Sequence, residues 1–287
     1  MRRTALAMLT ATFALGIGAC TDLTDGSIVN DEDPLTSTNG LSSNGLSSNG
    51  LSSNGLAMNG LSSNGLSSNG LSSNGLAMGA LRDLSATGDL TRTFFRYLVS
   101  CALTPNQSVT YTWTDADGRS HTEVNPGGLG LAPSWADHPA AQQDKELVSA
   151  CLAARTNSKG VTVPLSLRAK NVSGLSVSSS ERSSYTYGEG AFWGNLFAST
   201  PVLYSCSRAA LNVGVATSQY LAQGRTCASA GCGIIQYVGT CYASDLAVLG
   251  QACYERGGSN DWVSACNSQK SKLAASSANV LTTWLMP

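Results

Sequence analysis

The stretch Leu147-Val148-Ser149-Ala150-Cys151 closely repeats Leu98-Val99-Ser100-Cys101, and each of them ends in a cysteine. Apolar residues recur at helical spacing through both stretches, and each stretch is followed by a polar turn and a Val-Thr segment that favours a strand. Both cysteines therefore fall in the last turns of predicted helices. If the two helices pack side by side in the same direction, their sulfur atoms meet, so we predict a disulfide between Cys101 and Cys151.

The remaining cysteines predict a wider covalent framework. The chain has nine cysteines, of which eight follow residue 20. In a chain that is exported, an even number of cysteines indicates disulfides, although eight cysteines allow 105 connectivities. A zinc site at Cys227, Cys232 and Cys241 is the alternative, but its spacing lacks the close Cys-x-x-Cys pairs of structural zinc. We expect disulfides, with no metal and no cofactor. The eight candidates are Cys101, Cys151, Cys206, Cys227, Cys232, Cys241, Cys253 and Cys266.

Residues 84–287 are expected to form one small, disulfide-rich α+β domain with helices packed on a short, mainly antiparallel sheet. The predicted strands cover 108–113, 119–124, 161–169, 202–206 and 234–238, with the third kept to an edge or bulge by Pro164. The predicted helices cover 90–101, 137–156, 245–254 and 273–285, and a glycine-containing helix over 182–197 follows a capping box at Ser178 and Glu181.

Two loops of this domain have sharper alternatives. Asp115-Ala116-Asp117-Gly118 predicts a hairpin turn, because a calcium loop needs further oxygen ligands and a distal glutamate that the spacing does not supply. The glycine-rich stretch 127–135 is not followed by the Lys-Ser/Thr pair of a phosphate-binding loop, so it predicts close backbone packing around Trp135.

The beginning of the chain has the pattern of an export signal. Arg2 and Arg3 precede an apolar run over 5–17, and Gly18-Ala19 supplies the small residues of a cleavage site. Because Cys20 follows directly, the site resembles a bacterial lipobox. That resemblance implies removal of residues 1–19 and acylation of Cys20, so that the membrane partner is reached through acyl chains.

The residue after the acylated cysteine bears on location. In Gram-negative lipoproteins an aspartate there favours retention at the inner membrane, whereas this chain has Thr21, so the resemblance implies an outer-membrane lipoprotein. No second apolar run reaches the length of about 18 residues that a spanning helix requires. We therefore expect an anchor made of lipid alone.

Between this anchor and the domain lie two low-complexity segments. Residues 20–38 are polar and acidic, which predicts a disordered spacer. Residues 39–80 repeat Asn-Gly-Leu-Ser-Ser with a period of five, which matches neither a helix nor a strand. The repeat predicts a flexible tether, and the alternative is a short pentapeptide-type solenoid, whose two coils bury too few leucines to offset the entropy of ordering.

Composition and motifs exclude several functions. The net charge is −1 with only 12% charged residues, which gives no electrostatic reason to expect nucleic acid. A nucleophile elbow, a Walker loop and His-Glu-x-x-His are absent from the sequence. His121 and His138 are expected to be surface or capping residues.

The segment around Glu189 carries the one candidate for catalysis. It lies among aromatic residues that are expected to raise its pKa and to line a sugar subsite, with Asp137 or Glu123 as the partner carboxylate. The alternative is that Glu189 has a structural role. The surrounding aromatics are also a candidate ligand surface, made of Tyr185, Tyr187, Phe192 and Trp193.

The lipobox-like site, the Asn-Gly-Leu repeats and the segment Glu189–Phe197 together resemble uncharacterised cell-envelope lipoproteins of myxobacteria. The resemblance implies a location and brings no catalytic residue with it. We therefore expect a non-enzymatic, lipid-anchored envelope protein with a binding or structural role, whose partner is an envelope glycan or protein. The alternative is a secreted hydrolase that acts on polysaccharide through Glu189.

Overall fold

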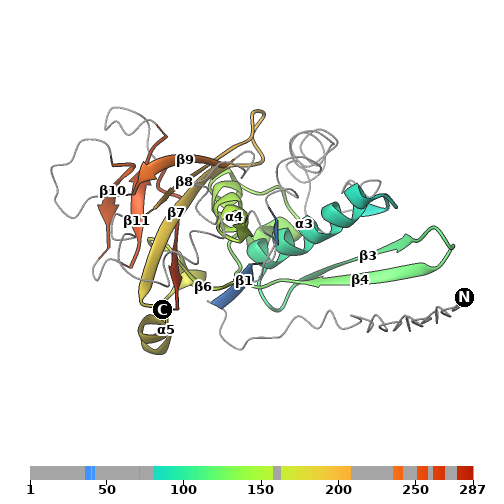
Figure 1. Ribbon diagram of the computed structural model, residues 1–287. Helices are drawn as coiled ribbons and strands as arrows, with labels where there is room; N and C mark the ends of the chain where they lie inside the picture. The colour runs from blue at the N-terminus through green and yellow to red at the C-terminus, as the bar shows by residue number, and fades with distance from the viewer. Residues whose placement is uncertain are drawn as a thin grey trace, which may run out of the picture. The chain divides into compact units, whose positions relative to one another are not determined.

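A six-stranded sheet forms the centre of the folded unit, which extends from Asp33 to Pro287 (Figure 1). The computed structural model describes residues 36–39, 41–42, 71, 81–157, 163–207, 235–241, 251–257, 261–268 and 277–286. The strand order is β1-β6-β12-β7-β8-β9, and every neighbouring pair is antiparallel except β8 with β9. These strands are β1 (Thr36–Asn39), β6 (Val163–Arg168), β7 (Tyr187–Asn195), β8 (Val202–Ser207), β9 (Ile235–Thr240) and β12 (Leu281–Leu285).

Two layers cover this sheet. Helices α3 (Ala86–Ala102) and α4 (Gln142–Ala154) pack against each other, and α4 lies against β7. A separate two-stranded sheet pairs β10 (Cys253–Arg256) with β11 (Val263–Cys266). The α+β class with a mainly antiparallel sheet is confirmed.

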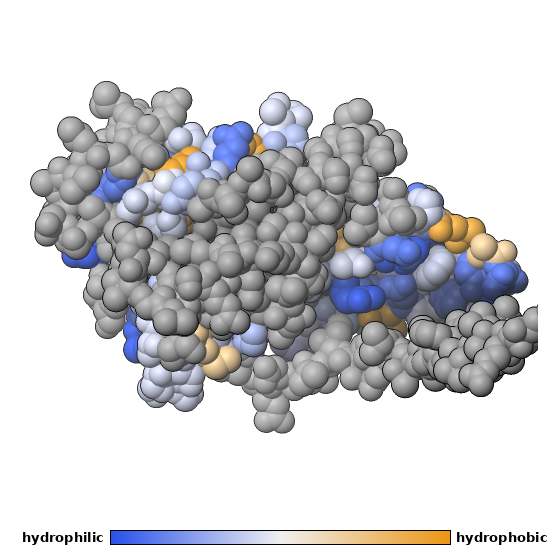
Figure 2. Space-filling view, viewed as in Figure 1, coloured by the Kyte–Doolittle hydropathy of each residue, from blue (hydrophilic) through white to orange (hydrophobic). Residues whose placement is uncertain are grey.

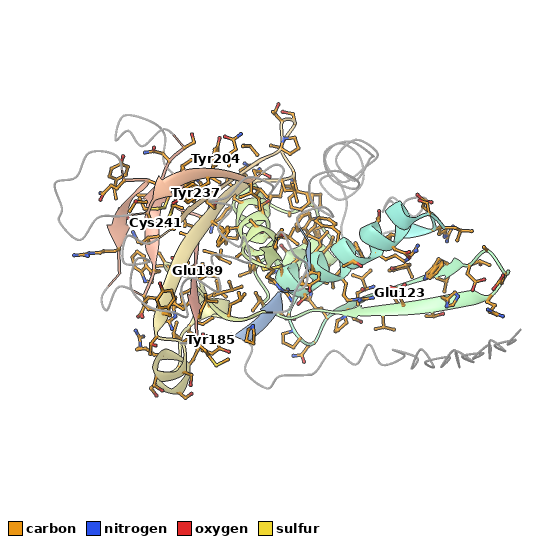
Figure 3. All side chains as sticks on the ribbon, viewed as in Figure 1. Glu123, Tyr185, Glu189, Tyr204, Tyr237 and Cys241 are labelled. Carbon is orange, nitrogen blue, oxygen red and sulfur yellow. A yellow bond between two sulfur atoms is a disulfide. The ribbon has the colours of Figure 1, made fainter. Side chains whose placement is uncertain are left out.

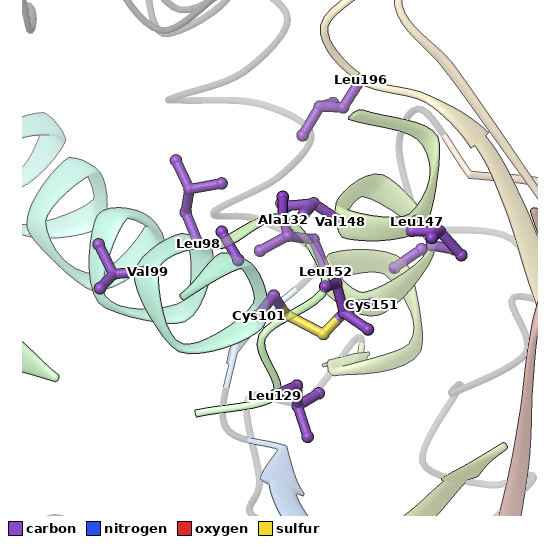
Figure 4. Close-up of a cluster of buried hydrophobic side chains, with 14 of the residues drawn as sticks. Leu98, Val99, Cys101, Leu129, Ala132, Leu147, Val148, Cys151, Leu152 and Leu196 are labelled. Atoms are coloured by element: carbon purple, nitrogen blue, oxygen red, sulfur yellow. A yellow bond between two sulfur atoms is a disulfide. The ribbon is translucent and has the colours of Figure 1, made fainter. Parts of the chain in front are cut away.

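Side chains of β7 alternate between the two layers. Phe192 belongs to the large apolar cluster shared with α3 and α4, whereas Ala191 and Trp193 belong to a smaller cluster shared with β10 and β11. Figure 4 shows part of the large cluster, where Leu98 and Leu152 lie around the contact between the two helices. Because successive side chains of a strand point to opposite faces, one strand supplies both cores.

Each of the described disulfides joins two elements within one layer. Cys101 and Cys151 form a disulfide between α3 and α4, which confirms that prediction (Figure 4). Cys206 pairs with Cys241, and Cys253 pairs with Cys266 across β10 and β11. The positions of Cys20, Cys227 and Cys232 lie outside the described residues.

Three disulfides in one domain indicate an extracytoplasmic protein, because the cytosol keeps thiols reduced. The sulfur atoms of Cys206, Cys241 and Cys253 lie within 4.8 Å of one another. Each of them is already bonded to another sulfur, so this cluster offers no thiolate to a zinc ion.

Helix α3 carries a long hairpin along its side. Strands β3 (Ser108–Thr114) and β4 (Ser120–Pro126) pair antiparallel, as the predicted hairpin requires. Asp115 makes the turn, since its Oδ1 accepts the N–H groups of Asp117 and Arg119, and Gly118 has a φ of +80°. The predicted hairpin turn is confirmed, and both carboxylate oxygens of Asp115 are engaged in it.

The glycine-rich loop caps the C-terminal end of helix α3. The N–H groups of Gly128 and Gly130 both donate to the carbonyl of Leu103, and that of Leu129 donates to the carbonyl of Ser100. A Cβ on Gly127 would lie 2.2 Å from the carbonyl oxygen of Thr104. Close backbone packing is confirmed, and its main partner is the last turn of α3, whose carbonyls lack helical donors.

The predicted helix over 182–197 is wrong. Ser178 accepts the N–H of Glu181 as the capping box requires, but the helix that follows is only α5 (Ser179–Ser184). Residues from Tyr187 onward form β7 instead. Aromatic residues favour a strand, and glycines weaken a helix by about 1 kcal/mol each. The helix that begins at this cap is therefore only six residues long.

The predicted C-terminal helix is also wrong, because residues 281–285 form β12 at the middle of the sheet. Tyr254, expected at the end of a helix, lies in β10. Helix α4 starts at Gln142 rather than at Asp137, since a short 3-10 turn, η1 (Pro133–Ala136), occupies the preceding residues. In each case sheet pairing or burial overrides a local pattern.

Strand β6 is flanked by β1 and β12, so the expectation of an edge strand is corrected. Pro164 lies beyond the residues that pair with β12, opposite Thr38 of β1. The missing N–H of Pro164 therefore does not interrupt the pairing of β6 with β12.

Two short segments from the spacer and the first repeat join the fold. Beside β1, strand β2 (Leu41–Ser42) pairs in parallel with β5 (Thr156–Asn157). Leu71 is fully buried, and its N–H donates to the carbonyl of Trp135 over 2.6 Å. These residues belong to the predicted spacer and tether, and the rest of residues 20–80 lies outside the described residues. Within the described residues, no helix is long and apolar enough to span a bilayer.

Candidate functional site

An open pocket of about 460 Å³ lies between the end of β6, the following loop, α5 and the segment that leads into β11. Its described lining combines polar or charged side chains with aliphatic ones and one indole. The lining residues are Arg168, Ala169, Asn171, Val172, Ser173, Leu175, Ser176, Val177, Arg182, Asp261 and Trp262.

Arg168 forms the inner wall of this pocket. Its side chain is 1% exposed, and it donates through Nη1 to Asp261 Oδ1 (2.9 Å), through Nη2 to the carbonyl of Tyr185 (2.9 Å) and through Nε to Ser166 Oγ (3.0 Å). Its guanidinium also lies 4.3 Å from the ring centre of Trp284. Burial lowers the pKa of Arg168, and the negative charge of Asp261 offsets part of this shift.

Asp261 links three elements. Its Oδ1 accepts a hydrogen bond from Arg168, and its Oδ2 accepts one from Arg182 at the mouth of the pocket. The carbonyl of Asp261 accepts the indole N–H of Trp284 over 2.7 Å. Two arginines thus share one carboxylate, an arrangement that fixes the segment before β11 and leaves a positively charged side at the pocket.

Trp262 forms the aromatic wall and is partly exposed. A Cβ on Gly257 would lie 2.1 Å from its indole, so only glycine allows this close packing. Lys170 Nζ lies 5.7 Å from the ring centre and pairs with Glu255 Oε2 at 2.8 Å. Hydrogen bonds from Lys170 and Ser264 lower the pKa of Glu255.

The structure places Glu189 away from this pocket. Its side chain is 2% exposed and it does not belong to the described lining. Gly188 and Gly190 stand opposite the successive residues Trp284 and Thr283 of β12, so Glu189 is the extra residue of a β-bulge. The structure therefore provides no open cleft at this carboxylate within the described residues.

The two expected partners of Glu189 lie on other elements. Glu123 is on the β3–β4 hairpin, at the far end of the domain in Figure 3. There it accepts from Tyr111 Oη (2.8 Å) and Trp113 Nε1 (2.9 Å), which fixes the hairpin. Burial and the hydrogen bond to Glu123 raise the pKa of Tyr111. Asp137 is exposed after η1.

The four aromatics expected at a ligand surface do not form one. Phe192 and Trp193 are buried in the two separate clusters on opposite faces of β7, and Tyr185 is 7% exposed. Tyr187 is partly buried against the large cluster. Period-two alternation in a strand separates neighbours that a helix would have placed on adjoining faces.

Sequence reasoning missed the pocket residues because they are 93 positions apart. One signal was present: Arg168 is the only charged residue of β6, and a charge at a buried strand position requires a partner. The sequence around Asp261 has no pattern that would identify it as the partner of Arg168.

Outside the pocket, exposed apolar side chains are scattered. The large ones in the described residues are Leu84, Val124, Tyr237 and Met286. Figure 2 shows strongly hydrophilic side chains over α3 and the β3–β4 hairpin. These observations leave the pocket as the best-formed candidate site among the described residues.

Comparisons with known proteins bear on the repeat segment. Residues 37–62 and 55–77 match the GLTT repeat, with six copies. No curated protein and no solved structure is significantly similar to the chain. The N-terminal region therefore contains GLTT repeats, and the site rests on its own geometry.

The described lining of the pocket supplies hydrogen-bonding and aromatic groups. The described lining includes one carboxylate, Asp261, and both of its oxygens accept from arginines. A general acid and base pair needs two carboxyl groups of different pKa or a histidine within reach, and the described lining supplies neither. Fixed polar groups beside an indole suit a bound ligand.

Proposed function

We propose that this protein is a non-enzymatic cell-envelope lipoprotein that holds a disulfide-linked binding domain at the outer membrane. The pocket formed by Arg168, Arg182, Asp261 and Trp262 is the observation that carries the binding role. Its lining is fixed by mutual ion pairs, so it is organised before any ligand arrives. The export signal, the lipobox-like Cys20 and the resemblance to myxobacterial envelope lipoproteins support the location.

The ligand that best fits this pocket is a saccharide of the envelope. Sugar rings present apolar C–H faces that pack on an indole, and hydroxyl groups that bond to planar side chains. Trp262 supplies the indole, while Asn171 and Arg182 supply donors at the exposed side of the pocket. A neutral or acidic sugar fits better than a polyamine, because two arginines meet a single carboxylate.

Binding is measured by tryptophan fluorescence of the full-length protein in detergent, titrated with N-acetylglucosamine and uronic-acid oligosaccharides. We expect saturable binding that weakens at least tenfold in Trp262→Ala. Tyr237→Phe is the matched control, since Tyr237 is an exposed aromatic on β9 outside the pocket. The proposal fails if neither probe binds, or if Trp262→Ala binds as well as the wild type.

The anchor is tested separately. A radiolabelled fatty acid supplied to expressing cells is expected to label the wild type and to leave Cys20→Ser unlabelled. The Cys20→Ser protein is also expected to be absent from the outer-membrane fraction. Label that persists in Cys20→Ser would place the modification elsewhere.

The alternative, a hydrolase that uses Glu189, has its own test. Burial of Glu189 argues against it, because a glycosidase carboxyl group must reach the scissile bond. Glu189→Gln is compared with the wild type on every glycan that the wild type hydrolyses. Unchanged rates exclude the alternative, and loss of activity with an unchanged melting temperature would favour it.

A further inference from the structure

The guanidinium of Arg182 is only partly engaged at the exposed side of the pocket. The side chain of Arg182 is 42% exposed, and its Nη1 donates to Asp261 Oδ2. Among the described residues, this guanidinium has no second hydrogen-bond acceptor. Because a guanidinium also carries N–H donors on Nε and Nη2, one edge of Arg182 remains for a ligand in the pocket that it lines.

The buried arginine, in contrast, has no donor nitrogen to spare. Arg168 is 1% exposed, and its three nitrogen atoms donate to Asp261 Oδ1, to the carbonyl of Tyr185 and to Ser166 Oγ. Glu181 is also buried, accepts from the same Ser166 hydroxyl and lies outside the described lining. The carboxylate of Glu181 therefore compensates the buried charge and does not occupy the mouth of the pocket.

The second basic residue near the indole is matched as well. Lys170 pairs with Glu255 at 2.8 Å, and neither residue belongs to the described lining. The other polar side chains of that lining, Asn171, Ser173 and Ser176, carry no charge. Within the described lining, the cationic donors left for a ligand are therefore those of the half-exposed arginine.

Arg182 and the indole of Trp262 are held near each other through Asp261. Asp261 directly precedes Trp262 in the chain, and its carboxylate accepts from Arg182. Asp261 is itself fixed by Arg168 and by the hydrogen bond from Trp284 to its carbonyl. A sugar ring packed on the indole of Trp262 therefore presents a ring substituent to the unused edge of Arg182.

We infer that the pocket selects saccharides whose ring carries a carboxylate, such as uronic acids, and that Arg182 determines this selection. The inference rests on the proposed saccharide binding. Nε and Nη2 of Arg182 bind the two carboxylate oxygens side by side, while Nη1 stays on Asp261. Charge-assisted hydrogen bonds of this planar kind are about twice as strong as neutral ones. A methyl ester at the same ring position lacks the charge and binds less tightly.

The test compares two ligands that differ only in this group, an oligogalacturonate and its fully methyl-esterified form of the same length. Each is titrated into the full-length protein in a non-ionic detergent, and binding is followed by tryptophan fluorescence. We expect the acid to bind at least tenfold more tightly than the ester. In Arg182→Gln the acid is expected to bind within twofold of the ester, with the affinity for the ester unchanged.

The unchanged affinity of Arg182→Gln for the ester shows that the variant is folded and that its pocket is intact. Arg119→Gln is the matched control, because Arg119 is a more exposed arginine on the turn between β3 and β4. It should keep the full preference for the acid. A preference that persists in Arg182→Gln, or that is lost in Arg119→Gln, would overturn the role of Arg182.

The two ligands also separate this inference from the proposed function. Equal binding of acid and ester by the wild type would overturn selection of the carboxylate, while saccharide binding itself would stand. If neither ligand binds, the proposed function fails and this inference fails with it. Trp262→Ala should weaken both ligands, because the indole packs on the ring that they share.

Discussion

Arg168 Nη1 donates to Asp261 Oδ1 over 2.9 Å, which ties β6 to a segment 93 residues further along the chain. The same carboxylate accepts from Arg182 through its other oxygen. One buried and one exposed arginine therefore meet at a single acidic residue at the mouth of the pocket.

Replacing the buried arginine is expected to be far more costly than replacing the exposed one. Arg168→Ala removes the buried member of the ion pair with Asp261 and the donors to Ser166 and to the carbonyl of Tyr185, and losing one member of a buried ion pair costs about 3–5 kcal/mol. Arg182→Ala removes a half-exposed pair, which costs about 0–1 kcal/mol. Urea denaturation measures both, and equal losses would contradict the structural role of Arg168.

The disulfide between the helices is expected to contribute more stability than the one across β10 and β11. Cys101 and Cys151 close a loop of 50 residues, whereas Cys253 and Cys266 close one of 13. Chain entropy gives about 4 kcal/mol for the first and about 3 kcal/mol for the second. Guanidinium unfolding of the two double-serine variants checks the order, which a larger loss in Cys253→Ser/Cys266→Ser would reverse.

A leucine of the repeat region is expected to stabilise the domain. Leu71 is fully buried, and its main-chain N–H donates to the carbonyl of Trp135. Because the buried side chain is truncated, Leu71→Ala should lower the free energy of unfolding by about 2–5 kcal/mol. Leu84→Ala is the control, because Leu84 is 51% exposed and surface changes stay within about 0.5 kcal/mol. A Leu71→Ala protein as stable as the control would exclude docking of this leucine.

Acid is expected to loosen the β3–β4 hairpin through Asp115. Its hydrogen bonds to His121 and to the N–H of Arg119 lower its pKa below the ordinary 3.8. The charged form therefore stabilises the fold above pH 3.8, and this contribution is lost as the pH falls through the lowered pKa. The melting temperature of Asp115→Asn should fall below that of the wild type at pH 6, with a smaller difference at pH 2.

Asp117 provides the matched substitution for that experiment. Asp117→Asn changes an exposed residue of the same turn, whose partner is the exposed Arg119. It should leave the melting temperature close to that of the wild type at both pH values. A constant difference for Asp115→Asn from pH 6 to pH 2 would contradict the role of its charge.

The position of the Trp262 indole at the pocket is expected to depend on Gly257. Gly257→Ala places a methyl group within 2.1 Å of Trp262, so the ring must move. A change in the tryptophan emission maximum, together with at least tenfold weaker saccharide binding, is the expected result. Unaltered emission and unaltered binding would mean that the ring position does not govern recognition.

Local sequence patterns determined several elements of this protein. The helix that ends near Cys101, the Asp115 hairpin and strands β8 and β9 all follow from signals within a few residues. Caps, turn residues and apolar spacing act over one or two turns of chain, so they can be recognised in the sequence alone.

Only the tertiary structure decided the pocket and the centre of the sheet. Residues 281–285 have a helix-like apolar pattern, but they become a strand because β6 and β7 offer main-chain partners on both sides. Arg168 and Asp261 likewise acquire a role only after folding brings them together. Pairing across a long loop depends on burial and ladder hydrogen bonds, which no local propensity encodes.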